Sequence, residues 1–433
     1  MSENDEIAID DLRDAWTSLA SNGTPPASEI SSRVLPAWSF GLDAWLDRLS
    51  AAYLRDYCRR NSHFKLAVAP YGGGKTHFLL TLAARATKEN WATCFLQCKA
   101  GLDISDWYSL YEQAARSIML PSGGKGIKAI AGAALKEMQR LAADKPDPQE
   151  VVDMLIEEAV EKDWPNASFG RVMGALLTHL RDPREKPELG AAALRWLEGQ
   201  AGSLSAKELG QLHLQRIVGA NRKTHGRELL YSLVRFLPRT GCHGLVLLLD
   251  EMDSILTAKG SALEQIMVAM RVMLDSPDGL DRTPLFGVFA AVPEISQQIK
   301  KYQALVSRFQ VTTPFHSGDD NAPQLDLSEL GNQQEILRGI GQKLLELGVK
   351  AHGWNFSRQL QEQNLERLAN VTANQVLQVS SRRLFVKTWC SILAEQSRTG
   401  ERAFPSHVLT ERVQGVYQTF RDAEEKPSAK DIG

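Results

Sequence analysis

Residues 65–80, KLAVAPYGGGKTHFLL, constrain the fold of this chain more than any other stretch. They begin with an apolar run at 66–68, pass through three consecutive glycines, and open an apolar helix at Lys75. In this order of strand, loop and helix, successive backbone N–H groups and the positive end of the helix converge on one anion. The stretch therefore predicts a phosphate-binding loop within an α/β fold.

The residue types in this loop suit a nucleotide and a magnesium ion. Lys75 is placed to reach the β- and γ-phosphates, and the Thr76 hydroxyl to bind Mg²⁺. The residues expected to line the nucleotide are Tyr71, Gly72, Gly73, Gly74, Lys75, Thr76 and His77. Ala69 stands where the G-x-x-x-x-G-K-[ST] pattern has its first glycine, and a positive φ there would cost about 1 kcal/mol. The alternative interpretation is a plain glycine-rich turn between a strand and a helix.

A second stretch, residues 244–256 (GLVLLLDEMDSIL), is a continuous apolar run closed by two acids. Such a run is typical of a fully buried central strand in a parallel sheet, and its acidic end would lie beside the phosphate loop. Asp250 would hold the Mg²⁺ shell, and Glu251 would align and polarise the attacking water. Taken alone, the acid pair has a helix cap as its alternative; together with the loop, it predicts ATP hydrolysis with ATP and Mg²⁺ as cofactors.

The composition is that of an ordinary soluble protein: 433 residues, 43% hydrophobic, with a formal net charge of −2. This charge does not indicate nucleic-acid binding, although it leaves a local basic face open. No run approaches the roughly 18 apolar residues of a membrane span, and the acidic N-terminus lacks a signal core, so we expect a cytoplasmic protein without membrane contact. Cys94 and Cys98 are expected to be small hydrophobes of a strand rather than metal ligands.

The remaining pattern divides the chain into an N-terminal arm, a core, a lid and a tail. Residues 1–45 form the arm, and residues 46–325 form the α/β core, a parallel sheet flanked by helices. A helical insertion without a convincing strand occupies about 103–238 of that core. Residues 326–420 are expected to be a helical lid, and 421–433 a disordered tail.

Within these parts we expect several individual elements. Amphipathic spacing predicts a helix leading into the first strand at 42–58, and apolar runs predict strands at 91–97 and 285–294. The helices expected elsewhere span 9–19, 263–274, 330–347 and 379–395.

Three arginines in the second half are candidates to complete the site. Arg308 follows the strand at 285–294, a location from which an arginine commonly reaches a neighbouring subunit's nucleotide. Arg382 and Arg383 stand at the start of a lid helix that Ser380 can cap, and from there they can reach back to the phosphates. Surface salt bridges or solvated charges are the alternative for all three.

Taken together, the motifs YGGGKTHFL, GLVLLLDEMDSIL, VFAAVPE and SRF resemble the BrxD-like ATP-binding proteins of bacteriophage exclusion (BREX) systems. The resemblance spans most of residues 20–400. It implies the P-loop fold of the origin-recognition branch of AAA+ and signal-transducing (STAND) ATPases. It also implies a defence role beside a helicase and a methyltransferase, in distinguishing and blocking phage DNA.

Carried over by position, the resemblance assigns nucleotide and Mg²⁺ binding to Gly72, Gly74, Lys75 and Thr76. It assigns hydrolysis to Asp250 and Glu251, and action in trans to Arg308. Ala69 and Val292 depart from the family's usual pattern, and these departures put the turnover rate in doubt more than binding.

Three functions remain open on the sequence. The first is a Mg²⁺-dependent ATPase that couples nucleotide state to assembly or DNA handling. The second is a nucleotide-gated scaffold that binds ATP with little hydrolysis. It is motivated by Ala69 and by apolar residues 290–292, where many ATPases of the additional-strand class have a polar residue near the γ-phosphate. The third is a small-molecule kinase, against which the acid pair and the lid argue.

Two contacts with other molecules are separate predictions. DNA binding is expected through Arg382, Arg383 and Lys387 of the lid, or through the helical insertion. An Arg308 that acts in trans requires a homo-oligomer.

Overall fold

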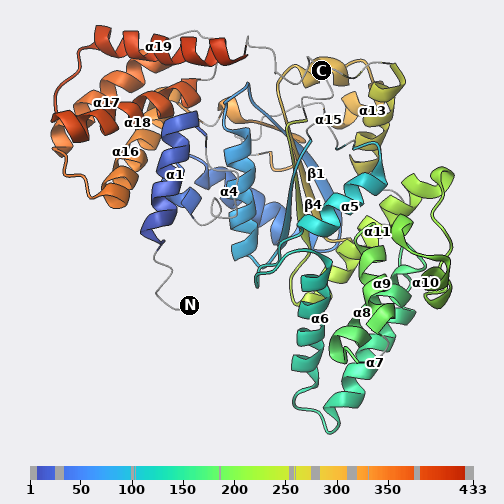
Figure 1. The fold of residues 1–433 in the computed structure, drawn as a ribbon. Coiled ribbons are helices and arrows are strands. Elements are labelled where there is room, and N and C mark those ends of the chain that lie inside the picture. The colour runs from blue at the N-terminus through green and yellow to red at the C-terminus, as the bar shows by residue number, and fades with distance from the viewer. Residues whose placement is uncertain are drawn as a thin grey trace.

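A parallel β-sheet forms the centre of the molecule (Figure 1). The computed structural model describes residues 7–24, 34–98, 102, 104–184, 187–252, 258, 260–274, 283–309, 319–329, 331–374 and 381–424. Its five strands are β1 (Ser62–Val68), β2 (Ala92–Gln97), β3 (Leu245–Asp250), β4 (Leu285–Ala291) and β5 (Gln324–Asp326). Their order across the sheet is β2-β3-β4-β1-β5, and every pair is parallel. The prediction of an α/β fold with a parallel sheet flanked by helices is confirmed.

The sheet differs from the sequence prediction at three points. β1 begins at Ser62, earlier than the predicted apolar run at 66–68. Lys65 interrupts the apolar pattern of the sequence, but in the structure it is buried in mid-strand, where its Nζ donates to Asp320 O at 3.1 Å. β4 ends at Ala291, three residues before the predicted end at 294. β5 was not predicted, since three residues are too few to show a periodic pattern.

The two faces of the sheet belong to two different hydrophobic clusters. Side chains alternate along each strand. On β1, Ala67 therefore packs with α3 (Asp43–Leu49) and α4 (Lys75–Lys88) on one face, while Leu66 and Val68 face the other. That second face is covered by α5 (Trp107–Ser117), α11 (Arg222–Phe236) and α13 (Gly260–Leu274). Figure 1 shows α4 and α5 on opposite sides of the sheet.

The helix predicted at 42–58 is broken into three pieces. After α3 the chain continues as a π-helix, η2 (Ser50–Leu54), and then as a 3-10 helix, η3 (Tyr57–Arg59). Tyr53 in the middle piece donates from its hydroxyl to Asp320 O at 2.6 Å, so packing against the chain before β5 accompanies the change in helix type.

Between β2 and β3 the chain is helical, and the segment from α5 to η6 is called the insertion below. Besides α5 and α11 it contains α6 (Gly126–Ala142), α7 (Pro148–Glu161), α8 (Phe169–Arg181), α9 (Pro187–Leu197), η4 (Ala201–Ser203), α10 (Ala206–Gln211), η5 (Gly219–Asn221) and η6 (Leu237–Thr240). In the GGKGIK sequence at 123–128, the first three residues precede α6, with positive φ at Gly123 and Gly124 and an isolated bridge between Met119 and Lys125, and the last three begin the helix. The insertion shares one continuous core with the sheet.

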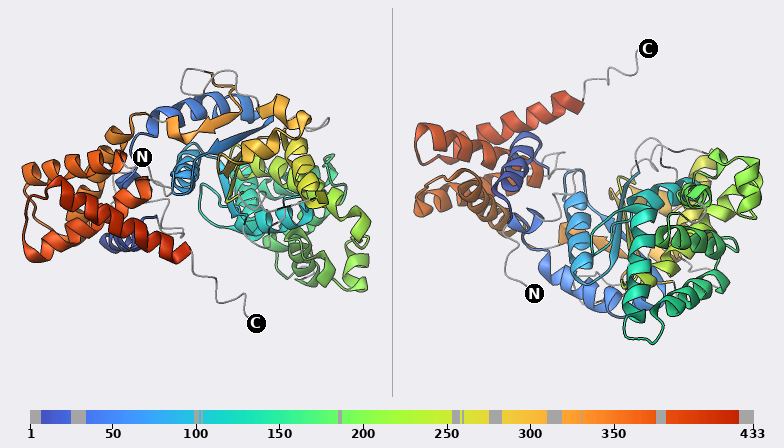
Figure 2. Two further views of the ribbon diagram at one scale, coloured as in Figure 1. Left: turned by 90° about the horizontal axis from the view of Figure 1, so that it is seen from above. Right: turned by 60° about the horizontal axis from the view of Figure 1, so that its bottom comes forward.

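The C-terminal helices form a second body beside the sheet. After α14 (Ile295–Ile299), α15 (Gln303–Phe309) and η8 (Leu327–Glu329) come α16 (Gln333–His352), α17 (Arg358–Ala373), α18 (Ser381–Thr399) and α19 (Ser406–Glu424). These last four pack with α1 (Ile9–Asn22) and η1 (Leu35–Ala37) around a core separate from those of the sheet, and we call this body the C-terminal cluster. In Figure 2 this cluster and the insertion lie on opposite sides of the sheet.

The N-terminal arm was predicted as a part of its own, but α1 packs into the C-terminal cluster through Leu12, Trp16 and Leu19. The helix α19 continues to Glu424, past the tail boundary predicted at 421, and residues 425–433 lie outside the described residues. The division into core and lid stays a prediction. Over the described part of the chain, no helix combines the length and the apolar character that a membrane crossing needs.

Candidate nucleotide-binding site

The glycine loop joins the carboxyl end of β1 to the first turn of α4. Gly72 and Gly74 have φ of 70° and 93°, the left-handed region that side chains rarely adopt. At Gly73 a Cβ would lie 2.7 Å from the Ala69 Cβ and 2.8 Å from Pro70 O. All three positions therefore require glycine, two for their backbone conformation and one for space.

Ala69 does not carry the strain that the sequence allowed for. Among the described residues, the non-glycine positions with positive φ are Asn90, His213 and Glu251, so Ala69 has an ordinary conformation. Its N–H donates to Ala291 O of β4 at 3.2 Å. The loop therefore tolerates a Cβ at this position, and the expected cost of about 1 kcal/mol does not arise.

Lys75 folds back over the loop. Its Nζ donates to Ala69 O at 2.9 Å and to Pro70 O at 3.3 Å, and lies 5.2 Å from the centroid of the Tyr71 ring. The Lys75 side chain is buried, whereas Tyr71 is 61% exposed. The ammonium group is thus held inside the loop, at the start of a helix whose first N–H groups have no intrahelical partner.

Thr76 and Asp250 connect the two predicted motifs directly. The Thr76 Oγ1 donates to Asp250 Oδ2 at 2.6 Å, although the two residues are 174 positions apart in the sequence. Asp250 is the last residue of β3 and is 1% exposed. Because parallel strands end at the same edge of the sheet, β1 and β3 deliver the loop and the acid to one place, with β4 between them.

Glu251 has a backbone conformation that is rare for its residue type. Its φ is 57°, in the left-handed region, and its N–H donates to Asp250 Oδ1 at 2.9 Å. Such a conformation costs roughly 1–2 kcal/mol and is concentrated at functional sites. The chain therefore turns sharply after β3, and the turn is held by the hydrogen bond from the Glu251 N–H to the Asp250 carboxylate.

The end of β4 supplies backbone rather than side-chain contacts. Ala290, Ala291 and Val292 are buried and apolar. Ala291 O accepts from Ala69 N, and Ala290 O accepts from Met252 N at 3.1 Å. Small side chains here let the loop and the acid strand approach from both sides, and the carbonyl groups bind both.

The structure gives the two arginines at the start of α18 different contacts. Arg382 Nη1 donates to Gly73 O at 2.8 Å, and Nη2 donates to Leu327 O at 3.1 Å. Arg383 instead donates from Nε to Asn22 O at 3.0 Å, and its guanidinium lies 4.4 Å from the Phe420 ring centroid. Burial lowers the pKa of Arg382.

The other basic candidates lie elsewhere. Lys387 packs against the same ring as Arg383, with its Nζ 4.7 Å from the Phe420 centroid, and so lies against α19. Arg308 belongs to α15, but its side chain lies outside the described residues. Ser380, the expected cap of the lid helix, also lies outside them.

His77 contacts residues 38–39, which follow η1 and are called the N-terminal segment below. The sequence did not suggest this contact. The His77 Nε2 is 2.8 Å from Ser39 Oγ, and its ring is tilted against Trp38 with centroids 6.4 Å apart. Burial, and then the nearby charge of Arg382, lower the pKa of His77 from 6.5 to about 4, so the ring is neutral at pH 7. Ser39 and Trp38 carry no motif that could have announced this contact.

The residues at this edge of the sheet fit a nucleotide with its magnesium ion. The Thr76 hydroxyl and the Asp250 carboxylate supply the hard oxygen atoms that Mg²⁺ prefers. Within the described ranges, no cluster of three or more His, Cys, Asp or Glu residues forms a dedicated metal cage, and the five cysteines are buried and unbridged. This suits an ion held by one or two protein ligands together with phosphates.

A glycine loop that leads from a parallel strand into a helix, facing an acid at the end of a nearby strand, fits the class of P-loop nucleotide-binding proteins. The chain belongs to the family of BREX system ATP-binding proteins BrxC/D, whose family model matches residues 34–409. The family resemblance inferred from the sequence is thereby confirmed. No curated protein and no solved structure matches the chain.

Proposed function

We propose that this protein is a Mg²⁺-dependent ATPase of an anti-phage BREX system, which couples nucleotide state to assembly or DNA handling. The observation that carries the proposal is the hydrogen bond from Thr76 to Asp250, because it brings the phosphate loop and the acid strand to one point. Membership in a family of BREX ATP-binding proteins supports ATP as the nucleotide.

Each residue has a separate task in this proposal. The glycine loop and the Lys75 ammonium bind the phosphates, and Thr76 with Asp250 holds the magnesium ion. When bound, the ion neutralises charge on the phosphate oxygens. Glu251 orients and polarises the attacking water, and its tight turn beside Asp250 keeps its carboxylate at the same edge of the sheet.

Arg382 links the C-terminal cluster to this site. It contacts the carbonyl of Gly73, inside the loop, so a bound nucleotide would share its surroundings with this guanidinium. The cluster would then be held differently when phosphates are present. Arg308 is proposed to act in trans on a neighbouring subunit, and the BREX helicase and methyltransferase are proposed as partners in the cytoplasm.

Two substitutions test the roles of the site. Lys75→Ala should abolish ATP binding in a calorimetric titration, whereas Lys88→Ala, an exposed lysine at the other end of the same helix, should leave it unchanged. Glu251→Gln should keep ATP affinity and stop phosphate release, since only the group that polarises water is altered. Wild-type turnover in Glu251→Gln would remove this residue from its role.

A nucleotide-gated scaffold with little hydrolysis is the second candidate. It is favoured by the end of β4, where Ala290, Ala291 and Val292 present no polar side chain to a γ-phosphate. Steady-state phosphate release, measured with and without DNA, separates the two candidates. Sustained release that the Glu251→Gln variant lacks would exclude the scaffold.

The mass of the protein in solution tests the proposed action of Arg308. A trans-acting arginine requires a neighbouring subunit, so the mass should increase when ATP is added to the Glu251→Gln variant. A monomer under both conditions would restrict catalysis to residues of one chain.

A further inference from the structure

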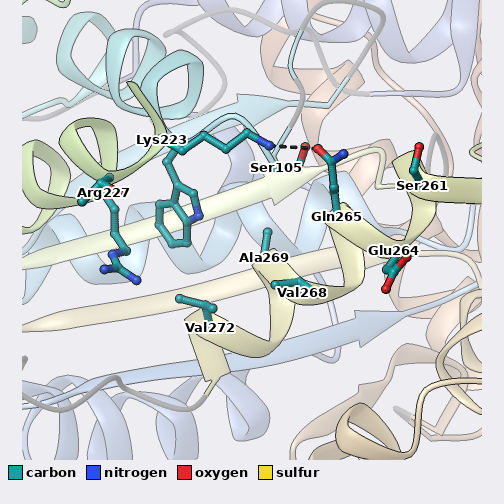
Figure 3. Close-up of a pocket in the computed structure, with 11 residues that line it drawn as sticks. Ser105, Lys223, Arg227, Ser261, Glu264, Gln265, Val268, Ala269 and Val272 are labelled. Carbon is teal, nitrogen blue, oxygen red and sulfur yellow. Dashed lines mark hydrogen bonds between the residues drawn. The ribbon is translucent and has the colours of Figure 1, made fainter. Parts of the chain in front are cut away.

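A cavity of about 420 Å³ lies between the insertion and α13, outside the nucleotide site (Figure 3). This volume is within the range of roughly 300–1,000 Å³ that small-ligand pockets occupy. The first turns of α11 contribute Lys223 and Arg227, and α13 contributes the facing wall with Gln265. Lys223 Nζ donates to Gln265 Oε1 at 2.9 Å, which connects the two walls.

One part of the cavity lining is apolar and accessible. Val268, Ala269 and Val272 lie along α13, and Trp107 stands at the start of α5. Val268 is 53% exposed, so part of this apolar wall is open to a ligand. The cavity therefore offers apolar surface to a ligand beside its charged and polar groups.

The rim of the cavity is positively charged. Its lining contains two cations, Lys223 and Arg227, against one carboxylate, that of Glu264. Arg222 is engaged by Asp106 at 3.6 Å and by the Tyr108 ring, but Arg227 has no ion pair or hydrogen bond among the described residues. An occupant that brings negative charge to this rim is the complementary one.

The polar groups opposite the rim are mostly acceptors. Glu264 and Gln265 lie on α13, and Figure 3 shows the Gln265 side chain directed toward Lys223, whereas the Glu264 carboxylate points away from Lys223 and Arg227. Carboxylate and amide oxygens accept hydrogen bonds from exocyclic amino groups of bases. Acidic peptide side chains would also satisfy the two cations, but they would leave the apolar wall of Val268 and Val272 uncovered.

We propose that this cavity binds an unpaired base of a single-stranded nucleic acid. The base packs against Val268 and Val272, its edge contacts Gln265, and Lys223 and Arg227 contact the flanking phosphates. Bases of a duplex are stacked and cannot enter such a cavity without being extruded. The inference rests on the α11 and α13 surfaces and does not require ATP hydrolysis.

Fluorescence anisotropy with a labelled single-stranded DNA 12-mer, using the full-length protein without nucleotide, tests the proposal. Wild-type protein should bind it more tightly than the corresponding duplex and more tightly than a 12-mer whose central positions are abasic. Arg227→Ala should weaken binding by about tenfold and reduce the dependence of log K on log salt by about one. Lys207→Ala, an exposed lysine of α10 outside the cavity, is the matched control and should change little.

A cavity-filling variant separates a base pocket from a merely basic surface. Val268→Trp should weaken binding of the intact 12-mer by about tenfold while leaving the abasic 12-mer unaffected, because only the base is excluded. Val160→Trp, at another exposed valine of the insertion, should leave both affinities unchanged.

Several results would overturn the proposal. They are equal affinity for intact and abasic 12-mers, unchanged binding in Val268→Trp, or no measurable binding of single-stranded DNA. Polyglutamate that displaces the 12-mer at equal charge concentration would assign the surface to an acidic partner protein instead. Because Lys75→Ala should retain 12-mer binding, a failure of the proposed ATPase site would be distinguishable from a failure of this one.

Discussion

The molecule carries two helical bodies beside one sheet, and they are attached in different ways. The insertion has no core of its own: its helices and one face of the sheet form a single hydrophobic cluster. The C-terminal cluster, which includes α1, has a core separate from both faces of the sheet. We therefore expect the insertion to be the more firmly attached body, because it shares buried apolar surface with the sheet, whereas the C-terminal cluster has a core of its own.

The contacts between the C-terminal cluster and the phosphate loop are few and specific. Arg382 reaches Gly73 O, Ser39 contacts His77, and Leu80 of α4 packs at the edge of the cluster core. The insertion instead covers the sheet beside Asp250 without a hydrogen bond from its described residues to the loop. We therefore expect the cluster to respond to nucleotide and the insertion to move with the sheet.

The largest expected effect comes from removing one core side chain in each attachment. Phe289→Ala in β4 and Trp389→Ala in α18 each remove a fully buried ring and should lower the free energy of unfolding by about 3–5 kcal/mol. Hydrogen exchange measured by mass spectrometry should show lost protection throughout sheet and insertion for Phe289→Ala. For Trp389→Ala the loss should stay within the C-terminal cluster. Lost protection over the whole chain in both variants would show that the two bodies are attached alike.

The next effect concerns the neighbouring arginines of α18. Arg382→Ala removes two charged hydrogen bonds at the loop and should weaken ATP binding by about 10- to 100-fold, which corresponds to about 1.5–3 kcal/mol. Arg383→Ala is the matched control, because its side chain contacts Asn22 and Phe420 instead. Isothermal titration with ATP should separate the two variants, and equal losses of affinity would contradict the assignment of Arg382 to the site.

A pH effect should follow from the interface between α4 and the N-terminal segment. The pKa of His77 is lowered from 6.5 to about 4 in the folded protein, so as the pH falls below 6.5 the unfolded chain binds a proton first. His77 therefore contributes stability above pH 6.5 that is lost between pH 6.5 and about 4. The loss should reach at most about 1.4 kcal/mol per pH unit. Urea denaturation across this range should show a weaker pH dependence for His77→Gln, and identical profiles would mean that His77 titrates normally.

The smallest expected effect is at Ser39. Ser39→Ala removes the contact with His77 and should lower the free energy of unfolding by about 1 kcal/mol, without a measurable change in ATP affinity. Ser397→Ala, an exposed serine of α18, controls for the loss of a hydroxyl group. A large change in ATP affinity in Ser39→Ala would place the N-terminal segment inside the nucleotide site.

The sequence predicted those parts of the fold that are encoded by continuous local patterns. The glycine loop and the apolar run ending at Asp250 each combine a buried strand with a marked end, and the run of β4 was predicted as a strand although it ends three residues earlier than expected. Their meeting followed from one rule, because parallel strands bring their carboxyl ends to one edge.

The parts that the sequence did not predict depend on packing between distant segments. The three residues of β5 are a strand only because β1 pairs with them. The packing of α1 into the C-terminal cluster, and the opposite directions of Arg382 and Arg383, are set by neighbours that no periodic pattern identifies. The left-handed φ of Glu251 is likewise a backbone property that residue type alone would not predict, and the ordinary φ of Ala69 differs from what its position in the loop motif suggested.

The carbonyl groups at the end of β4 have one more consequence. Ala290 O and Ala291 O hold the chain on either side, one through Met252 and the other through Ala69. A one-residue slip of β4 would therefore displace the phosphate loop and the acidic turn by the same step. It would also move each β4 side chain to the opposite face of the sheet. β4 thus acts as a fixed spacer between β1 and β3, and its backbone sets the separation of the phosphate loop from the acidic turn.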